Sequence, residues 1–229
     1  MRKLYVGNKN YSSWSMRPWI LMKQAGIEFE EVAVRFDSFE ADSQFKNIIG
    51  ALNPAAKVPV LVEDDGLVIW DTLAIAEYLA ESFPDKHLWP QARADRARAR
   101  SVCAEMHAGF GGLRNHCGMN LEASLPEVGA RLLKEVPEVA SDLARIVQMW
   151  SGLLETHGGP MLFGREFGIA DAYFAPVGTR IKTYGLPVPA RITAYIERVQ
   201  ALPGVKAWID AGLAEKDFLQ FEEPYRTGR

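Results

Sequence analysis

The order of apolar and polar residues changes character part-way along the chain. In the first eighty or so residues, short runs of β-branched and aromatic residues alternate with segments in which apolar residues recur at helical spacing. Runs of the first kind are typical of strands, and recurrence of the second kind is typical of helices. The pattern predicts strands over 3–7, 29–34, 58–62 and 67–70 and helices over 12–25, 39–49 and 72–83.

A tight turn joins the last two of these strands. Asp64-Asp65-Gly66 lies between two apolar runs, and such a sequence predicts a hairpin whose strands pair antiparallel. Pro84 ends the helix that follows. The first part of the chain therefore has the element order βαβαββα.

Strand patterns disappear after Pro90. Gly and Pro residues divide the remainder into segments of helical periodicity over 92–120, 125–157, 169–184, 189–202 and 203–214. We expect an α/β domain over 1–83, a linker over 84–91 and an all-α helical bundle domain over 92–229. The last stretch, 216–229, has no clear period and is expected to wrap back over the surface.

Composition and charge narrow the class of protein. The chain has 229 residues, is 48% hydrophobic and carries a formal net charge of −3, so it offers no basic excess for nucleic acid or an anionic membrane. Its start lacks the apolar stretch of a secretory signal, and its longest apolar runs are strand-sized. We expect a soluble, cytoplasmic protein.

Two cysteines cannot form a disulfide framework, and we interpret Cys103 and Cys117 as buried thiols. Together with His107 and His116 they offer metal-type ligands, but their spacing fits no standard zinc site. Core and pocket-lining roles are favoured, and we predict no metal.

The sequence Trp70-Asp71-Thr72 opens the predicted helix 72–83. Thr72 and the free N–H groups of a helix N-terminus can bind a carboxylate, while Asp71 can pair with an ammonium group, so one turn suits both ends of an amino acid. The alternative is an ordinary Asp/Thr helix cap.

Three motifs together resemble the glutathione transferase superfamily, and the resemblance covers nearly the whole chain. The serine-rich loop over 10–17 (NYSSWSMR) is similar to the active-site loop of the zeta class. The segment 51–61 (ALNPAAKVPVL) matches the loop and strand that hold the glutathione backbone, and 70–75 (WDTLAI) is similar to the turn that receives the γ-glutamyl group. The resemblance implies a thioredoxin-like first domain that binds glutathione, and a homodimer.

The resemblance also assigns the glutathione-binding residues. A cis peptide bond between Val58 and Pro59 would turn the Val58 amide and carbonyl toward the cysteinyl part of glutathione. Lys57 is a candidate for the glycyl carboxylate, or else a solvated lysine. Asp71 and Thr72 would receive the γ-glutamyl group, and Ser13 would complete the site.

Catalysis in this family requires a thiolate. A free thiol with a pKa of about 8.5 leaves little nucleophile at neutral pH, and a hydroxyl donor at the positive end of a helix lowers that pKa. We assign Ser12 as this catalytic donor from its place in the Ser-Ser pair. Ser13 and Tyr11 remain rival hydroxyls, and capping of the helix remains an alternative role for the serines.

We expect a second-substrate pocket formed by Tyr11, Trp14, Arg17 and Phe110. Arg17 would raise the positive potential or bind an anionic co-substrate; a surface ion pair is the alternative. Trp14 stands where the zeta class has its cysteine, which argues against maleylacetoacetate isomerase chemistry. We expect addition of the thiolate to an apolar electrophile, with a cis-trans isomerase and a non-catalytic binding module as alternatives.

The segment 164–172 (GREFGIADA) resembles the capping segment of the same family, with Gly168 where a Ser or Thr usually lies. Asp171 can still accept hydrogen bonds from backbone amides at the start of the helix. We predict a structural role for Asp171 and no catalytic one.

Overall fold

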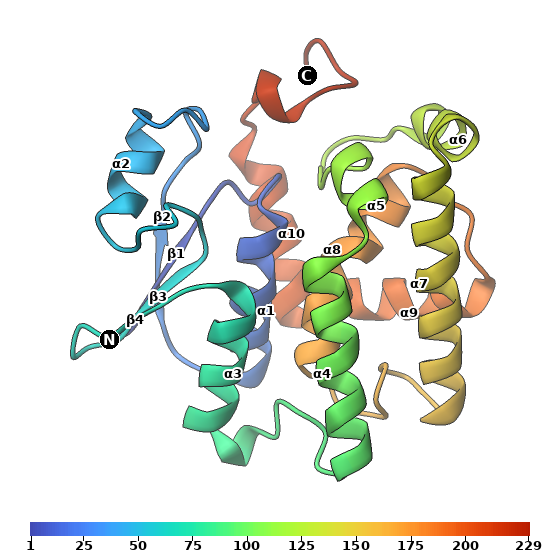
Figure 1. The fold of residues 1–229 in the computed structure, drawn as a ribbon, viewed down its shortest axis with the longest axis horizontal. Helices are drawn as coiled ribbons and strands as arrows, with labels where there is room; N and C mark the ends of the chain where they lie inside the picture. Colours follow the sequence, from blue (N-terminus) through green and yellow to red (C-terminus); the bar gives the residue numbers. More distant parts are fainter.

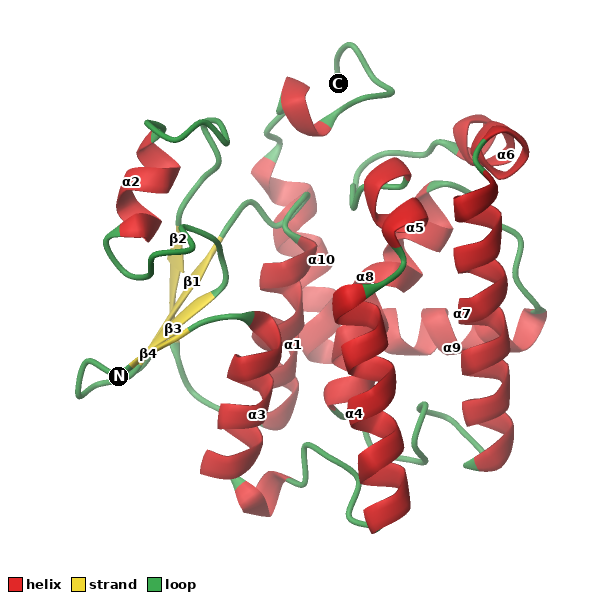
Figure 2. Cartoon of the chain, in the orientation of Figure 1, coloured by secondary structure: helices red, strands yellow, loops and turns green.

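Four short strands form a mixed sheet in the first part of the chain. The computed structural model describes all residues, Met1–Arg229, and orders the strands β2-β1-β3-β4 (Figures 1 and 2). β1 pairs parallel with β2 and antiparallel with β3, and the predicted hairpin joins β3 to β4. The strands are β1 Lys3–Val6, β2 Glu30–Ala33, β3 Val60–Val62 and β4 Val68–Ile69.

Alternating side chains of the strands bury the two faces of the sheet against different helices. Leu4, Val6 and Leu61 belong to the large core that includes α1 and α3, whereas Tyr5 and Val60 belong to a smaller cluster with α2. Figure 1 shows α2 on one side of the sheet and α1 and α3 on the other. This period of two confirms the predicted strands. The helices are α1 Ser13–Ala25, α2 Gln44–Gly50 and α3 Thr72–Ser82.

The rest of the chain is helical, and the predicted α/β-plus-all-α fold class is confirmed. Two predicted helices were wrong in length, because the segments 92–120 and 125–157 each form two helices. The helices are α4 Arg93–Ala108, α5 Gly111–His116, α6 Pro126–Glu135, α7 Pro137–Thr156, α8 Ile169–Thr183, α9 Ala190–Ala201 and α10 Pro203–Glu215, with short 3-10 turns η1 Pro84–Lys86 and η2 Gln220–Glu222.

Local chemistry explains both breaks. Pro137 has no N–H to continue the helix, and the residue before a proline avoids the helical region; Val136 accordingly has φ −123° and ψ 90°. Between α4 and α5, Phe110 adopts a left-handed conformation with φ 56°. Arg114 donates to the carbonyl oxygens of His107 and Gly109, so the exposed end of α4 keeps hydrogen-bond partners.

Asp171 fixes the start of α8. Its carboxylate accepts hydrogen bonds from the backbone N–H groups of Leu162 and Gly168, both at 3.0 Å, and from the Tyr195 hydroxyl at 3.0 Å. The side chain is 2% exposed. The predicted structural role of Asp171 is confirmed.

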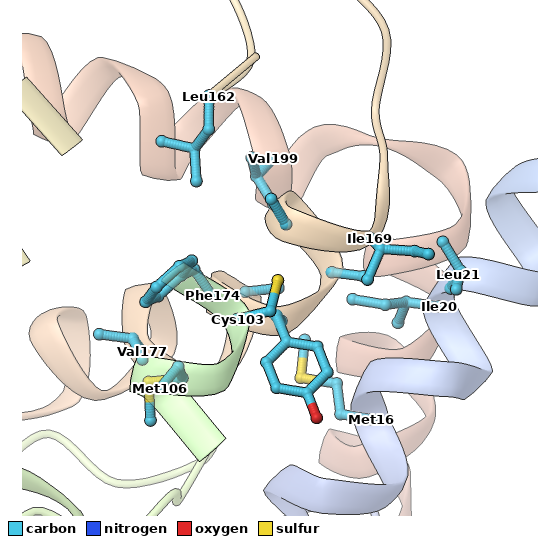
Figure 3. Close-up of a cluster of buried hydrophobic side chains, with 14 of the residues drawn as sticks. Met16, Ile20, Leu21, Cys103, Met106, Leu162, Ile169, Phe174, Val177 and Val199 are labelled. Atoms are coloured by element: carbon cyan, nitrogen blue, oxygen red, sulfur yellow. The ribbon is translucent and has the colours of Figure 1, made fainter. Parts of the chain in front are cut away.

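Helix α1 lies between the two parts of the chain. It packs against α3 and β1 on one side and against α8 and α10 on the other. Figure 3 shows Ile20 and Leu21 of α1 beside Ile169 of α8, with Cys103 of α4 and Phe174 of α8 in the same cluster. One continuous core therefore joins the sheet domain to the helical domain.

The loop between β1 and α1 is held by residues distant in sequence. The Asn10 side chain, 2% exposed, accepts from the Leu121 amide at 2.8 Å and donates to Asn120 at 3.1 Å. The Glu215 carboxylate, at the end of α10, accepts from the backbone N–H groups of Lys9 and Asn10. The helical domain thereby sets the position of this loop.

The C-terminal segment also contacts this loop. The Glu223 carboxylate is 3% exposed and accepts from the Tyr11 hydroxyl at 2.7 Å and from Asn120 at 2.9 Å. Tyr225 donates its hydroxyl to the backbone carbonyl of His116 at 2.8 Å. The segment therefore wraps back over the body of the protein, as the sequence predicted.

We expect Asn10→Ala to destabilise the protein by about 1–3 kcal/mol, because it leaves the backbone N–H of Leu121 without its acceptor and removes the hydrogen bond to Asn120. Urea unfolding followed by circular dichroism measures the change. Asn47→Ala, at an exposed position of α2, is the matched control and should change stability by less than about 0.5 kcal/mol. Equal effects of the two substitutions would contradict the role assigned to Asn10.

Candidate functional site

Two neighbouring cavities lie where the N-termini of α1 and α3 meet the helical domain. The smaller cavity has a volume of about 210 Å³ and the larger about 400 Å³. They share Trp14, Lys57, Val58 and Arg114 in their walls. The smaller cavity is otherwise lined by Ala55, Pro59, Trp70, Asp71, Thr72 and His107, and the larger by Tyr11, Ser12, Ser13, Phe36, Phe39, Phe45, Lys46, Gly118, Met119, Arg180 and Glu222.

Ser12 and Ser13 stand at the N-terminus of α1 in the wall of the larger cavity. Ser12 occupies the N-cap position, but its side chain makes no capping bond, and the first turn holds no acidic residue. The Ser12 hydroxyl donates instead to the hydroxyl of Ser15 at 2.8 Å, and Ser13 accepts from Arg180 at 3.1 Å. The positive end of the helix therefore has no compensating side-chain charge or cap.

The Ser12 hydroxyl can be released toward a ligand without loss of its bond to Ser15. A hydroxyl both donates and accepts, and its hydrogen rotates to suit its partners. Ser15 also accepts from the Gly7 amide at 3.2 Å, which leaves its own hydrogen free to be donated to Ser12. In that arrangement the Ser12 O–H is available to a ligand in the cavity.

The Val58–Pro59 peptide bond is cis, as predicted. Neither the N–H nor the C=O of Val58 takes part in an internal hydrogen bond, and Val58 lies in the walls of both cavities. A ligand backbone can therefore pair with both groups, as a strand pairs with a sheet edge. Lys57, the preceding residue, is exposed and also lines both cavities.

Asp71 and Thr72 open α3 at the smaller cavity. One Asp71 carboxylate oxygen accepts from the Leu73 amide at 3.1 Å, so the predicted helix cap is present. The other oxygen lies 3.6 Å from Nε2 of His107. Thr72 is 3% exposed, and its hydroxyl donates to the backbone carbonyl of Trp14 at 3.4 Å. Capping therefore uses one Asp71 oxygen and leaves the second facing the helical domain.

The alternative role considered for Arg17, a surface ion pair, was wrong. Arg17 is 2% exposed and has no carboxylate partner; it donates to the backbone carbonyls of Tyr173 and Ser13, both at 2.9 Å. Its guanidinium lies 4.1 Å from the centre of the Trp14 ring, and burial lowers the pKa of this guanidinium. Arg17 lines neither cavity. It supports Trp14 from behind as a buried cation on an aromatic face.

Of the two further residues expected in the second-substrate pocket, Tyr11 lines the larger cavity and Phe110 lines neither cavity. Phe110 is 6% exposed and packs in the main core between α4 and α5, away from both cavities. Tyr11 does line the larger cavity, but its hydroxyl is bound to Glu223 and to the carbonyl of Asp217. Burial and the bond to Glu223 raise the pKa of Tyr11 to about 12. The Tyr11 hydroxyl thus binds the C-terminal segment, and the Tyr11 side chain forms part of the cavity wall.

Comparison with known proteins gives the family. Residues 11–82 match the model of the glutathione S-transferase N-terminal domain, and residues 90–211 match that of the C-terminal domain. The chain belongs to the glutathione S-transferase family. The predicted resemblance is confirmed. Both cavities are built from residues of the two matched regions, and the larger cavity also includes Glu222 of the C-terminal segment.

Relatives of this glutathione S-transferase chain carry two kinds of name. A probable maleylacetoacetate isomerase from Caenorhabditis elegans is 33% identical over 76% of this chain and 76% of its own length. Glutathione S-transferase 1 from Dianthus caryophyllus is 28% identical over 95% of this chain and 90% of its own length. A Burkholderia glutathione transferase homologue with bound glutathione is 25% identical, with a TM-score of 0.68 over 94% of this chain and 99% of that one.

Several residues of the cavities were not predicted from the sequence. Arg180 could have been singled out as a candidate functional residue, because it is a charged residue in α8, of which 14 of the 15 residues are buried. A core or pocket-lining role was favoured for His107 over a metal site, but its position between Asp71 and the Tyr173 hydroxyl was not predicted. Nothing in the periodicity pointed to the other charged residues missed in these walls, Lys46, Arg114 and Glu222.

Other features of the glutathione S-transferase chain offer little chemistry. A cavity of about 460 Å³ between α3 and α4 is lined by Glu77, Trp89 and Arg100, but these polar groups bind one another. The side chains of histidine, cysteine and acidic residues form no cluster of three suited to a metal ion. None of the helices combines the length and apolar character needed to cross a membrane.

We expect the stability of the protein to depend on pH through Glu222. Burial raises the pKa of Glu222 from 4.5 to about 7, against an opposing effect of Arg180. The folded state therefore binds the proton more tightly than the unfolded state, and the stabilisation is lost as the pH rises through about 7. Glu222→Gln should raise the melting temperature at pH 8 and change it little near pH 4, as measured by calorimetry.

Glu197→Gln, at an exposed position of α9, provides the control for this prediction. It should leave the pH dependence of the melting temperature as in the wild type. A Glu222→Gln variant whose melting temperature differs from that of the wild type by the same amount at both pH values would contradict the prediction.

Proposed function

We propose that this chain activates the thiol of bound glutathione as a thiolate for addition to an apolar electrophile. The observation that carries the proposal is the position of the Ser12 hydroxyl, in the cavity wall at an uncapped helix N-terminus, beside the free backbone groups of Val58. In this proposal residues 1–83 bind glutathione, and the helical residues 92–229 form the opposite wall for the electrophile.

Glutathione fits the two cavities in one direction. Its γ-glutamyl end would lie in the smaller cavity, with its carboxylate at Thr72 and the N-terminus of α3 and its ammonium at the free Asp71 oxygen. The cysteinyl backbone would pair with Val58, and the glycyl carboxylate would meet Lys57. This orientation places the thiol at the N-terminus of α1, where the larger cavity begins.

The proposed mechanism is electrostatic. The O–H of Ser12 donates to the sulfur, and the free N–H end of α1 adds positive potential, so both favour the thiolate over the thiol. A depression of the thiol pKa by about 1–2 units gives a large thiolate fraction at neutral pH. The thiol proton passes to water, and the thiolate electron pair forms the C–S bond. The displaced π electrons of the electrophile move to the neighbouring atom, which takes up a proton from solvent. Ser13, bound to Arg180, would position the loop and complete the glutathione site.

A glutathione-dependent cis-trans isomerase is the second candidate. The maleylacetoacetate isomerase names among the relatives favour it, and the serine loop is compatible with it. Trp14 opposes it, because this bulky ring lies in both cavities at the place where the zeta class has a cysteine. A non-catalytic binding module would bind glutathione without a shift of the thiol pKa.

Family membership also supports a homodimer in the cytoplasm with a role in detoxification. The homodimer and the role in detoxification rest on the resemblance, and the cytoplasmic location rests also on the start and the short apolar runs of the sequence.

We expect Asp71→Asn to separate capping from glutathione binding. Asparagine caps a helix as well as aspartate does, so thermal stability should stay unchanged, whereas loss of the charge that meets the ammonium group should weaken glutathione binding about tenfold. Calorimetric titration with glutathione measures the affinity. The control is Asp65→Asn, in the turn between β3 and β4. Unchanged affinity in Asp71→Asn would show that Asp71 only caps α3.

Ultraviolet titration of bound glutathione tests the central proposal. Thiolate absorbance should rise with a midpoint about 1–2 pH units below that of free glutathione in the wild type, and near the free value in Ser12→Ala. Ser13→Ala and Tyr11→Phe should retain most of the shift, and Ser101→Ala, at an exposed position of α4, is the control. Glutathione that binds without a shift in the wild type would favour the binding module.

A further inference from the structure

The larger cavity has a strongly cationic wall. Lys46, Lys57, Arg114 and Arg180 line it, and none of the four forms an ion pair with a carboxylate. Glu222 is the only acidic residue in this wall. Unpaired cations around a cavity favour an anionic ligand.

The four cations divide between the two domains. Lys46 and Lys57 belong to the first domain, beside Val58, and under the proposed function they suffice for the glycyl carboxylate of glutathione. Arg114 of α5 and Arg180 of α8 lie in the opposite wall. Their charges therefore remain for the second substrate.

Arg180 is held in place but not satisfied. It is 5% exposed; its Nε donates to the backbone carbonyl of Cys117 at 2.8 Å and one terminal nitrogen to Ser13 at 3.1 Å. The other terminal nitrogen, Nη1, is buried without a hydrogen-bond partner. A buried donor without an acceptor destabilises the protein, and a ligand oxygen that accepts from it would recover this loss. A guanidinium is well suited to a carboxylate.

The remainder of the wall is apolar. Phe36, Phe39 and Met119 line the same cavity as Arg180. A ligand that fills the cavity must therefore present an apolar body to these side chains and an anion to the arginines.

We propose that the second substrate is an electrophile with an apolar body and a carboxylate, and that Arg180, assisted by Arg114, binds this carboxylate. The inference rests on the proposed function and defines the class of its electrophile. Arg180 then determines substrate specificity, while Ser12 serves the sulfur.

Two glutathione conjugates that differ only in charge test this inference by binding. S-(4-carboxy-2-nitrophenyl)glutathione carries the carboxylate, and its carboxamide analogue has nearly the same shape without the charge. Calorimetric titration at pH 8 gives both dissociation constants. We expect the wild type to bind the acid about tenfold more tightly than the amide, since one charged pair of this kind is worth at least about 1.4 kcal/mol.

Arg180→Met should reduce this preference to about two-fold or less, while Lys182→Met, an exposed cation on the same helix, should leave it unchanged. A wild type without preference, or an Arg180→Met variant that keeps it, overturns the inference. If Arg180→Met instead raises the thiol pKa of bound glutathione and leaves the preference intact, Arg180 acts on the thiolate and the inference is equally overturned.

Glu222→Gln provides an independent test should Arg180→Met fail to fold. Removal of the one negative charge in the wall should increase the preference for the acid by about three-fold or more at pH 8, and an unchanged preference overturns the inference. Failure of the two conjugates to bind at all would refute the proposed function, and the inference with it. Equal binding of both would refute the inference alone.

Discussion

The burial of α1 between two domains is the constraint on which the rest of the structure depends. One side of the helix packs on β1 and α3, and the other packs on α8 and α10. Its apolar residues therefore belong to a single core, which fixes the direction in which its N-terminus points. Because Ser12, Ser13 and Trp14 lie at that terminus, the geometry of the candidate site is a consequence of packing between the domains.

Hydrogen bonds from the helical part of the chain also hold the loop that precedes α1. The sheet cannot satisfy the backbone N–H groups of the loop before α1, and Glu215 accepts hydrogen bonds from two of them. Asn120 and, in the C-terminal segment, Glu223 bind side chains of the same loop. Burial makes each of these bonds expensive to lose. The contacts that join the domains therefore also hold this loop, and they keep the hydroxyl of Ser12, the proposed catalytic donor, close to one position.

The sequence predicted the parts of the site that depend on local chemistry. The Asp71 cap follows from the chemistry of a helix N-terminus, whereas the cis Val58–Pro59 bond and the serine loop were predicted from short motifs that resemble the family. The structure brings all three to two adjoining cavities. Residues of the opposite wall could not be predicted in this way. Periodicity identifies α8 as buried but does not say which helix it packs against. The sequence therefore could not predict which cavity Arg180 faces. Arg17 was misplaced for the same reason.

The C-terminal segment bears on both parts of the proposed site, the part for glutathione and the part for the second substrate, and its two glutamates act on them separately. Glu223 binds the loop that carries Ser12, whereas its neighbour Glu222 faces the cavity and offsets the arginines. A substitution at Glu222 changes the charge of the second-substrate wall without touching a residue that would hold glutathione. The proposed glutathione half depends more on backbone, because the N–H and C=O groups of Val58 and the free N–H groups at the start of α1 and α3 act there beside the side chains of Ser12 and Asp71. If the proposed function holds, specificity for the electrophile is thus the more adjustable property, since it would depend on a few charged side chains of the larger cavity.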